Sequence, residues 1–147
     1  MPWFRTENER VADELEKVHD EISRIVRQLE SHAEAAPYPH VAERLRGIQS
    51  ADEEASGALA RRLVELGRQP NGSAHGAVKS GRNSWERLNV TVEDYRGLMR
   101  QLTQLWVRWD DEHPADAALI RDLIDAATRN REDLLDLAAR SDPHALD

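Results

Sequence analysis

Between residues 7 and 33, apolar residues recur in alternating steps of four and three, and this repeat strongly constrains how the chain folds. A helix with 3.6 residues per turn places such residues on one narrow stripe. The stripe consists of Val11, Leu15, Val18, Ile22, Ile25 and Leu29. Thr6 precedes it, and Glu9 follows three residues later, which is the pattern of a capping box at a helix start. The pattern predicts an amphipathic helix that begins after Thr6 and ends at about Ala33.

A second stripe follows a proline-containing turn. Proline lacks a backbone donor, so residues 35–39 end the first helix, and Pro39 can open the next. The second stripe consists of Val41, Leu45, Ile48, Ala55, Leu59, Leu63 and Leu66. Gly67 suits the left-handed conformation that ends many helices. Residues 67–83 show no clear periodicity, although residues 74–88 could hold a short, irregular helix. We therefore expect a long crossing connection after the second helix.

Two further helices complete the pattern. The third is predicted to begin at Thr91, which can cap it, and to end near His113. The fourth begins at Pro114, where a missing backbone donor costs nothing. Their stripes are formed by Tyr95, Leu98, Leu102, Leu105 and Trp109, and by Ile120, Leu123, Ala127, Leu134 and Leu137.

Four such stripes can be hidden from water only if the helices pack around a shared core. The chain has 147 residues, the usual length of one domain. It contains one Phe and two Tyr among many Ala, Leu, Glu and Arg residues, which suits helices better than sheets. We expect an all-α, antiparallel four-helix bundle that forms a single domain over residues 1–141, followed by a mobile tail at 142–147.

The charge and composition exclude several classes of function. A net charge of −8 repels phosphate, which argues against nucleic-acid binding. No apolar run approaches the roughly 20 residues that a membrane span needs, and we expect a cytoplasmic protein that binds no membrane. The absence of cysteine excludes disulfides, thiolate nucleophiles and cysteine-based zinc sites.

Polar residues interrupt two of the stripes near mid-bundle. Asp52 falls in the middle of the second stripe, between Ile48 and Ala55. In the fourth helix, Asn130 and Arg131 border the stripe, and Arg131 could meet Asp52. One interpretation is a buried polar layer that fixes helix register. The other is a ligand-binding site formed by Asp52, Asn130 and Arg131.

A di-iron bundle would need carboxylates from two helices and a Glu-x-x-His pair from each of the others. The chain has one such pair, Glu16 and His19, but Glu16 is predicted to face solvent and His19 to lie on the flank of the stripe. No histidine follows Asp52 in ligand position, and Asn130 stands where a ligand is wanted. We therefore expect no metal, no cofactor and no catalytic residue.

The four tryptophans carry much of the chain's aromatic area. Trp109 belongs to the third stripe, Trp106 falls toward its edge, and Trp3 precedes the first helix. Trp3 and Trp106 could therefore cover the rim of the core or form an exposed patch that serves as a homodimer interface.

Residues 58–70 (ALARRLVELGRQP), residues 72–78 (GSAHGAV) and Trp85 together resemble a known pattern. They are similar to small bacterial ferritin-like bundles of unknown function, and more distantly to the stress-associated YciE and YciF-type proteins. In these proteins a helix ends in Leu-Gly-x-x-Pro and leads through a glycine-serine turn into a short helix with a tryptophan. The resemblance covers roughly residues 40–90. It implies a cytoplasmic, often dimeric, ferritin-like bundle and carries no established activity.

The function expected from the sequence is that of a non-enzymatic ferritin-like bundle, which acts through self-association or contacts with another protein. Two alternatives stay open. One is a metal-binding oxidoreductase bundle that uses Asp52 with partners such as Glu53 and His19. The other is a small-molecule binder at the mid-bundle polar residues, with Trp109 beside them.

Overall fold

The chain folds into an all-α four-helix bundle. The structure is a computed structural model, and it describes residues 6–70 and 76–147. The helices are α1 (Glu7–Ala35), α2 (Pro39–Glu65), α3 (Ser84–Glu112) and α4 (Pro114–Ala139), and the described residues contain no strand. None of these helices is long and apolar enough to cross a membrane.

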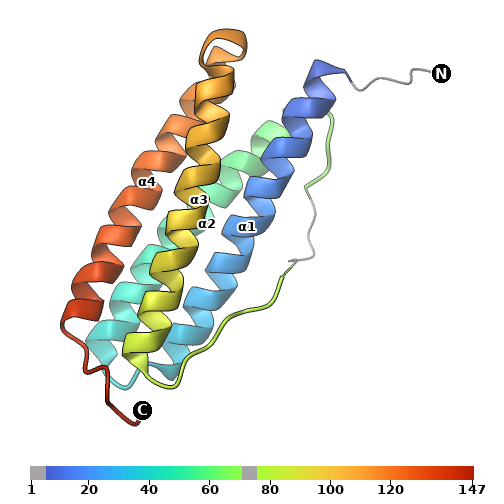
Figure 1. The fold of residues 1–147 in the computed structure, drawn as a ribbon. Coiled ribbons are helices and arrows are strands. Elements are labelled where there is room, and N and C mark those ends of the chain that lie inside the picture. Colours follow the sequence, from blue (N-terminus) through green and yellow to red (C-terminus); the bar gives the residue numbers. More distant parts are fainter. Residues whose placement is uncertain (1–5, 71–75) are drawn as a thin grey trace.

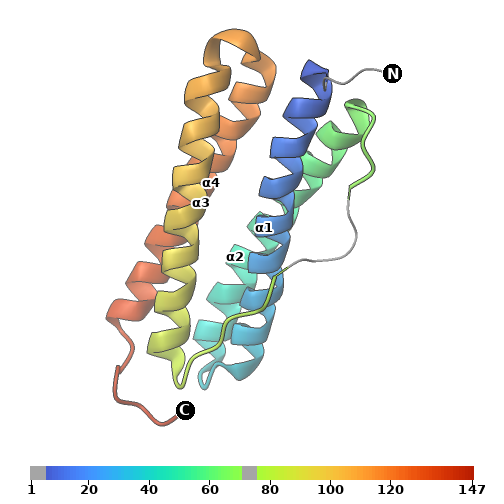
Figure 2. The same ribbon diagram turned by 45° about the vertical axis from the view of Figure 1, so that its right-hand side comes forward.

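The bundle consists of two helical hairpins (Figure 1). Helices α1 and α2 form one closely packed antiparallel pair, and α3 and α4 form the other. The described parts of the connection from α2 to α3, residues 66–70 and 76–83, lie on the side of α1, as Figures 1 and 2 both show. Helices α2 and α3 run in the same direction. We call the end where α1 and α4 end and α2 and α3 begin the base of the bundle.

The helix ends follow the signals in the sequence. The capping box is confirmed, because the Glu9 amide donates to Thr6 Oγ1 (3.1 Å) and the Thr6 amide donates to Glu9 Oε2 (3.4 Å). Gly67 has the left-handed φ of 82° that was predicted for the end of α2. Beyond it, the Arg68 amide donates to the Leu63 carbonyl (2.8 Å), which is the pattern of a Schellman cap.

The start of α3 differs from the prediction. The helix begins at Ser84 rather than Thr91 and is one continuous element; residues 77–83 are not helical, and residues 71–75 lie outside the described part of the chain. Asn83 provides the cap, since its side-chain oxygen accepts from the Glu86 amide (2.8 Å). Thr91 is instead fully buried inside the helix, where its hydroxyl bonds the Arg87 carbonyl (3.3 Å). Of the short extra helix predicted within residues 74–88, residues 84–88 are therefore the first part of α3.

The predicted stripes form one shared core. Almost all of their residues are buried, and only Ala55 and Leu66 of α2 are half-buried. The largest fully buried side chains come from all four helices and are Tyr95, Leu15, Ile22, Ile25, Leu29, Leu59, Leu63, Leu88, Leu102, Leu105, Ile120 and Leu134. The core therefore binds the two hairpins into a single unit.

Candidate functional site

The mid-bundle polar layer joins three helices. Asp52 of α2 is only 3% exposed and lies among core residues. Its carboxyl group accepts hydrogen bonds from the Tyr95 hydroxyl of α3 and from Asn130 Nδ2 of α4 (3.0 Å). The donors reach different carboxyl oxygens, so both oxygens of Asp52 have a partner. This layer ties the α3–α4 hairpin to α2.

Burial dominates the electrostatics of this layer. Loss of solvation raises the pKa of Asp52 to about 7, although the hydrogen bonds from Tyr95 and Asn130 favour the ionised form. Burial, reinforced by the neighbouring Asp52 charge, also raises the pKa of Tyr95 well above its ordinary value. The phenol is thus a fixed donor, and Asp52 is the group that changes charge near neutral pH.

The structure brings Asp52 and Asn130 together but pairs neither with Arg131. Among the described residues, Arg131 makes no hydrogen bond or ion pair with Asp52, and its buried Nε has no hydrogen-bond partner. Tyr95 takes the place that the sequence suggested for Arg131. A tyrosine on an apolar stripe is easily read as core alone, but its hydroxyl needs a partner when buried, and that need was the available signal.

The layer approaches the surface through Asn130. This residue lines an open hollow of about 510 Å³ between α2 and α4, together with Ile48, Arg44 and Asp133 among others. Arg44 and Asp133 form an ion pair there (3.4 Å). Asp52 itself lies behind Asn130 and does not line the hollow.

The residues of the Glu-x-x-His pair do not converge. Glu16 accepts from Arg68 Nη1 (3.1 Å), which attaches the start of the connection to α1. His19 is buried, and its Nδ1 has no hydrogen-bond partner. Over residues 6–70 and 76–147, no group of three or more His, Asp or Glu residues is placed to hold a metal ion.

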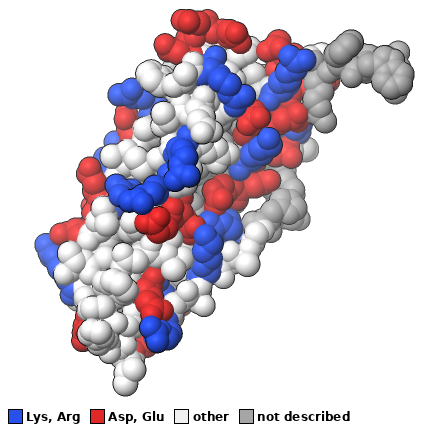
Figure 3. Space-filling model, in the orientation of Figure 1, with Lys and Arg blue, Asp and Glu red and all other residues white. Residues whose placement is uncertain are grey.

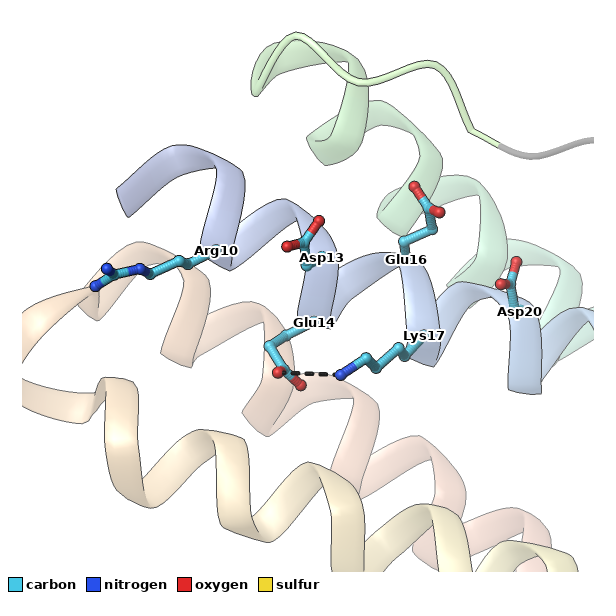
Figure 4. Close-up of a pocket in the computed structure, with 6 residues that line it drawn as sticks. All are labelled: Arg10, Asp13, Glu14, Glu16, Lys17 and Asp20. Atoms are coloured by element: carbon cyan, nitrogen blue, oxygen red, sulfur yellow. Dashed lines mark hydrogen bonds and ion pairs between the residues drawn. The ribbon is translucent and has the colours of Figure 1, made fainter. Parts of the chain in front are cut away.

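The other carboxylates near the start of α1 line an open hollow of about 330 Å³ (Figure 4). Glu14 and Lys17 point to one side of the helix and pair (3.4 Å), whereas Asp13, Glu16 and Asp20 project from another side. Arg68 Nη2 reaches Asp13 Oδ1 (2.9 Å). The acidic side chains therefore form surface ion pairs rather than a convergent cluster.

A second polar cluster, which the sequence did not predict, lies between α1 and α3. Gln28 of α1 is completely buried, and its Nε2 donates to Thr91 Oγ1 (2.9 Å) and Asp94 Oδ2 (2.7 Å) of α3. Arg24 Nη1 donates to Gln28 Oε1 (2.9 Å), and Arg24 Nη2 pairs with Asp94 Oδ1 (3.2 Å). We call Arg24, Gln28, Thr91 and Asp94 the α1–α3 polar cluster.

This cluster holds residues 76–83, which we call the strap. The Lys79 amide donates to Gln28 Oε1 (3.0 Å), and Lys79 Nζ donates to Asp94 Oδ1 (2.5 Å). His32 Nε2 lies 2.8 Å from the Lys79 carbonyl oxygen. Burial lowers the pKa of His32, partly offset by the bond to that carbonyl, so the neutral ring with a proton on Nε2 fits the site. The cluster thus fixes the strap against α1 and α3.

The base carries a hollow of about 380 Å³ with an apolar lining. Its walls include Tyr38, Val41 and Leu137, and its rim carries Arg44, Arg140, His40 and Asp142 among others. Tyr38 is 61% exposed, and its ring stacks on His40 with the centroids 5.8 Å apart. We call this feature the base hollow.

Residues 140–147 form one wall of the base hollow. Asn83 Nδ2 donates to the carbonyl oxygens of Pro143 (3.0 Å) and Ala145 (3.1 Å), and the Ser84 hydroxyl donates to Asp147 Oδ2 (3.0 Å). Ala145 and Asp147 line the hollow, whereas the side chain of Leu146, between them, is fully exposed. The structure therefore holds the predicted tail against the start of α3.

Exposed apolar side chains gather toward the base. Among the described residues, the six large exposed ones are Tyr38, Val64, Trp85, Val107, Leu135 and Leu146. Four of them, all except Val64 and Val107, lie at or near the base. In Figure 3 the lower end of the molecule shows a broad uncharged surface, while acidic and basic side chains crowd the upper part.

Of the two tryptophans predicted to cover the rim of the core or to form an interface, the structure describes Trp106, which lies on α3. Trp106 is half-buried against the core, and the Arg121 guanidinium lies over its ring, 5.5 Å from the centroid. Trp3 lies outside the described residues.

The fold and its two polar layers define a four-helix bundle in which one long connection joins two antiparallel hairpins. Comparison with profiles of known protein families finds no match, and comparison with curated protein sequences finds no relative.

Proposed function

We propose that this protein is a non-enzymatic, ferritin-like four-helix bundle in the cytoplasm that acts through protein contacts at its base, and first of all through contacts with a second copy of itself. The observation that carries this proposal is the gathering of exposed apolar side chains toward the base, where Tyr38 lines the base hollow and Leu146 lies on the segment that forms one of its walls. Exposed apolar surface beside charged residues is typical of protein-binding sites.

The arrangement of the helices supports the ferritin-like part of the proposal. Ferritin-like bundles have one long crossover connection, and here α2 ends at one end of the bundle while α3 begins at the other (Figure 1). Gly67 and Pro70, on which the resemblance in part depends, stand at the start of this connection.

The polar layers support a structural role for the bundle interior. Both oxygens of Asp52 already accept hydrogen bonds, and the Gln28 side chain is shared among Arg24, Thr91, Asp94 and the strap. Buried polar groups that are bonded in this way fix helix register and partner choice.

The proposed contact can be tested with a matched pair of lysine substitutions. Tyr38 precedes α2 at the base, and Val64 lies near the far end of the same helix, 57% exposed. We expect wild-type protein to dimerise and Tyr38→Lys to dissociate the dimer, because lysine in the contact must lose its hydration. Sedimentation equilibrium over a wide range of concentrations measures both dissociation constants.

Val64→Lys is the control because it makes the same charge change on a surface of similar exposure. It should leave the dimer intact. Each substitution also reduces the negative net charge of the chain, so dissociation by Tyr38→Lys alone would not be explained by charge repulsion between copies. A dimer that resists Tyr38→Lys, or that Val64→Lys disrupts equally, would contradict a contact at the base.

A further inference from the structure

We propose that Leu146 of each copy inserts into the base hollow of the other, so that the segment 140–147 is the recognition element of a two-fold symmetric dimer. This inference rests on the proposed function and specifies its contact. It assigns a binding role to a segment that the sequence alone predicts to be a mobile tail.

Leu146 projects into solvent from a segment whose backbone is hydrogen-bonded to the start of α3. Its side chain is fully exposed, with a relative accessibility of 103%, while the backbone beside it is held in place. Asn83, itself buried, donates to the Ala145 carbonyl (3.1 Å), and Asp147 Oδ2 accepts from the Ser84 hydroxyl (3.0 Å). Covering an exposed leucine side chain with a partner makes the free energy of association more favourable. Because the backbone on either side of Leu146 is already held, little further conformational entropy is lost on binding.

The base hollow has the lining and the volume to receive this leucine. The base hollow has apolar walls at Tyr38, Val41 and Leu137, and its volume of about 380 Å³ accommodates a leucine side chain. Tyr38 is the most exposed large aromatic residue among those described, and it stands at this hollow. A partner's Leu146 would cover this ring and the apolar walls together.

The position of Leu146 beside the hollow is compatible with two-fold symmetry. In a two-fold dimer the same surface serves both copies, so the insert and the receiving hollow must lie side by side on one protomer. Leu146 meets this condition, because the residues on either side of it, Ala145 and Asp147, line the hollow of their own copy. A rotation about an axis near the rim carries each leucine toward the opposite hollow.

The charges of the rim are complementary in the same geometry. Arg44 of α2 stands on one side of the hollow, and Asp142 stands on the segment 140–147. Insertion of this segment into the partner's hollow would bring Asp142 of one copy toward Arg44 of the other. Such complementarity opposes the repulsion between two chains of charge −8.

Serine substitution of two exposed leucines tests the insertion. Leu146→Ser should raise the dimer dissociation constant roughly 100-fold or more, because the symmetric contact is lost twice. Leu135→Ser, at a 39% exposed leucine of α4 that does not line the hollow, should change it less than about threefold. Circular dichroism of both variants checks that the bundle remains folded.

Cross-linking identifies the contact directly. The chain contains no cysteine, so single-cysteine variants carry one thiol each. Leu146→Cys and His40→Cys protein, purified separately and mixed with a short bismaleimide, should form a mixed covalent dimer, because His40 lines the hollow. Leu146→Cys mixed with Val107→Cys, a residue 67% exposed on α3, should form far less.

The outcomes separate this inference from the proposed function. The insertion is overturned if the dimer forms normally, is insensitive to Leu146→Ser and gives no cross-link above the Val107→Cys control. That result would leave a contact of another kind at the base. Wild-type protein that stays monomeric at the highest concentration tested overturns both. Loss of the dimer in Leu146→Ser, together with the specific cross-link, establishes that Leu146 inserts into the partner's base hollow.

Discussion

Replacing Asp52 by asparagine is expected to stabilise the folded protein at about pH 8 while leaving it nearly unchanged near pH 4. The folded state raises the pKa of Asp52 from 3.8 to about 7, so folding favours the neutral carboxyl group. Stability from this residue is therefore greatest below the unfolded pKa and falls as pH rises toward the folded pKa. Asparagine has a similar shape and does not ionise; its amide oxygen can accept from Asn130 Nδ2, and its amide nitrogen can donate to the Tyr95 hydroxyl oxygen.

The size of this stability difference follows from the shift in the pKa of Asp52 on folding. Each unit of pKa difference corresponds to about 1.4 kcal/mol, so the stability advantage of Asp52→Asn should grow by about 3 kcal/mol between about pH 5 and about pH 8. Urea unfolding of both proteins across this range measures it. Asp125→Asn removes the same charge from a side chain that is 52% exposed, and its effect should stay within about 1 kcal/mol. A constant difference between Asp52→Asn and wild type would contradict the burial argument.

The sequence predicts the fold well because the fold depends on a repeated local signal. Each stripe is defined by residues three and four apart, and a helix places these on one face wherever it lies in the bundle. The signals at Thr6, Gly67 and Pro114 are equally local, since each depends on the backbone needs of a single helix end. Four helices and most of their ends could therefore be predicted without knowledge of the packing.

The start of α3 shows where a local signal misleads. Val90, Thr91 and Val92 are β-branched, and a threonine before an acidic residue resembles a helix cap. In the structure the helix passes through them, because Leu88, Val92 and Tyr95 are buried on a continuous core face. Tertiary burial outweighs the weak helix preference of β-branched residues.

The polar clusters could be predicted only in part because each depends on helices far apart in sequence. The burial of Asp52 could be predicted because its place within an apolar stripe can be read from the sequence of one helix alone. Gln28 lies one position before Leu29 on α1 and resembles any polar residue beside a stripe. Its burial depends on Asp94, 66 positions away, and on the strap, which has no periodicity to reveal where it lies.

Replacing Asp94 by alanine is expected to destabilise the protein by about 2 to 4 kcal/mol. The Asp94 carboxylate accepts from Gln28 and Lys79 and pairs with Arg24. Alanine therefore removes one acceptor from the buried Arg24 guanidinium, which keeps Glu21 and Gln28, and one from the Gln28 amide, which keeps Thr91. Removing one partner of a buried pair costs far more than removing an exposed one. Urea unfolding at constant pH gives the difference, and Asp125→Ala, at an exposed ion pair with Arg121, should cost less than about 1 kcal/mol.

The same variant should release the strap before the bundle unfolds. Lys79 is a trypsin site whose amide and carbonyl are held by Gln28 and His32, so cleavage after it requires local opening. Without Asp94, the strap loses the Lys79 ion pair, and Gln28 loses one of the contacts that orient it. We therefore expect trypsin to cut after Lys79 at least about ten times faster in Asp94→Ala than in wild type under native conditions, where about 1.4 kcal/mol of lost protection corresponds to tenfold. Equal cleavage rates alongside a large loss of global stability would mean that Asp94 holds α1 to α3 without holding the strap.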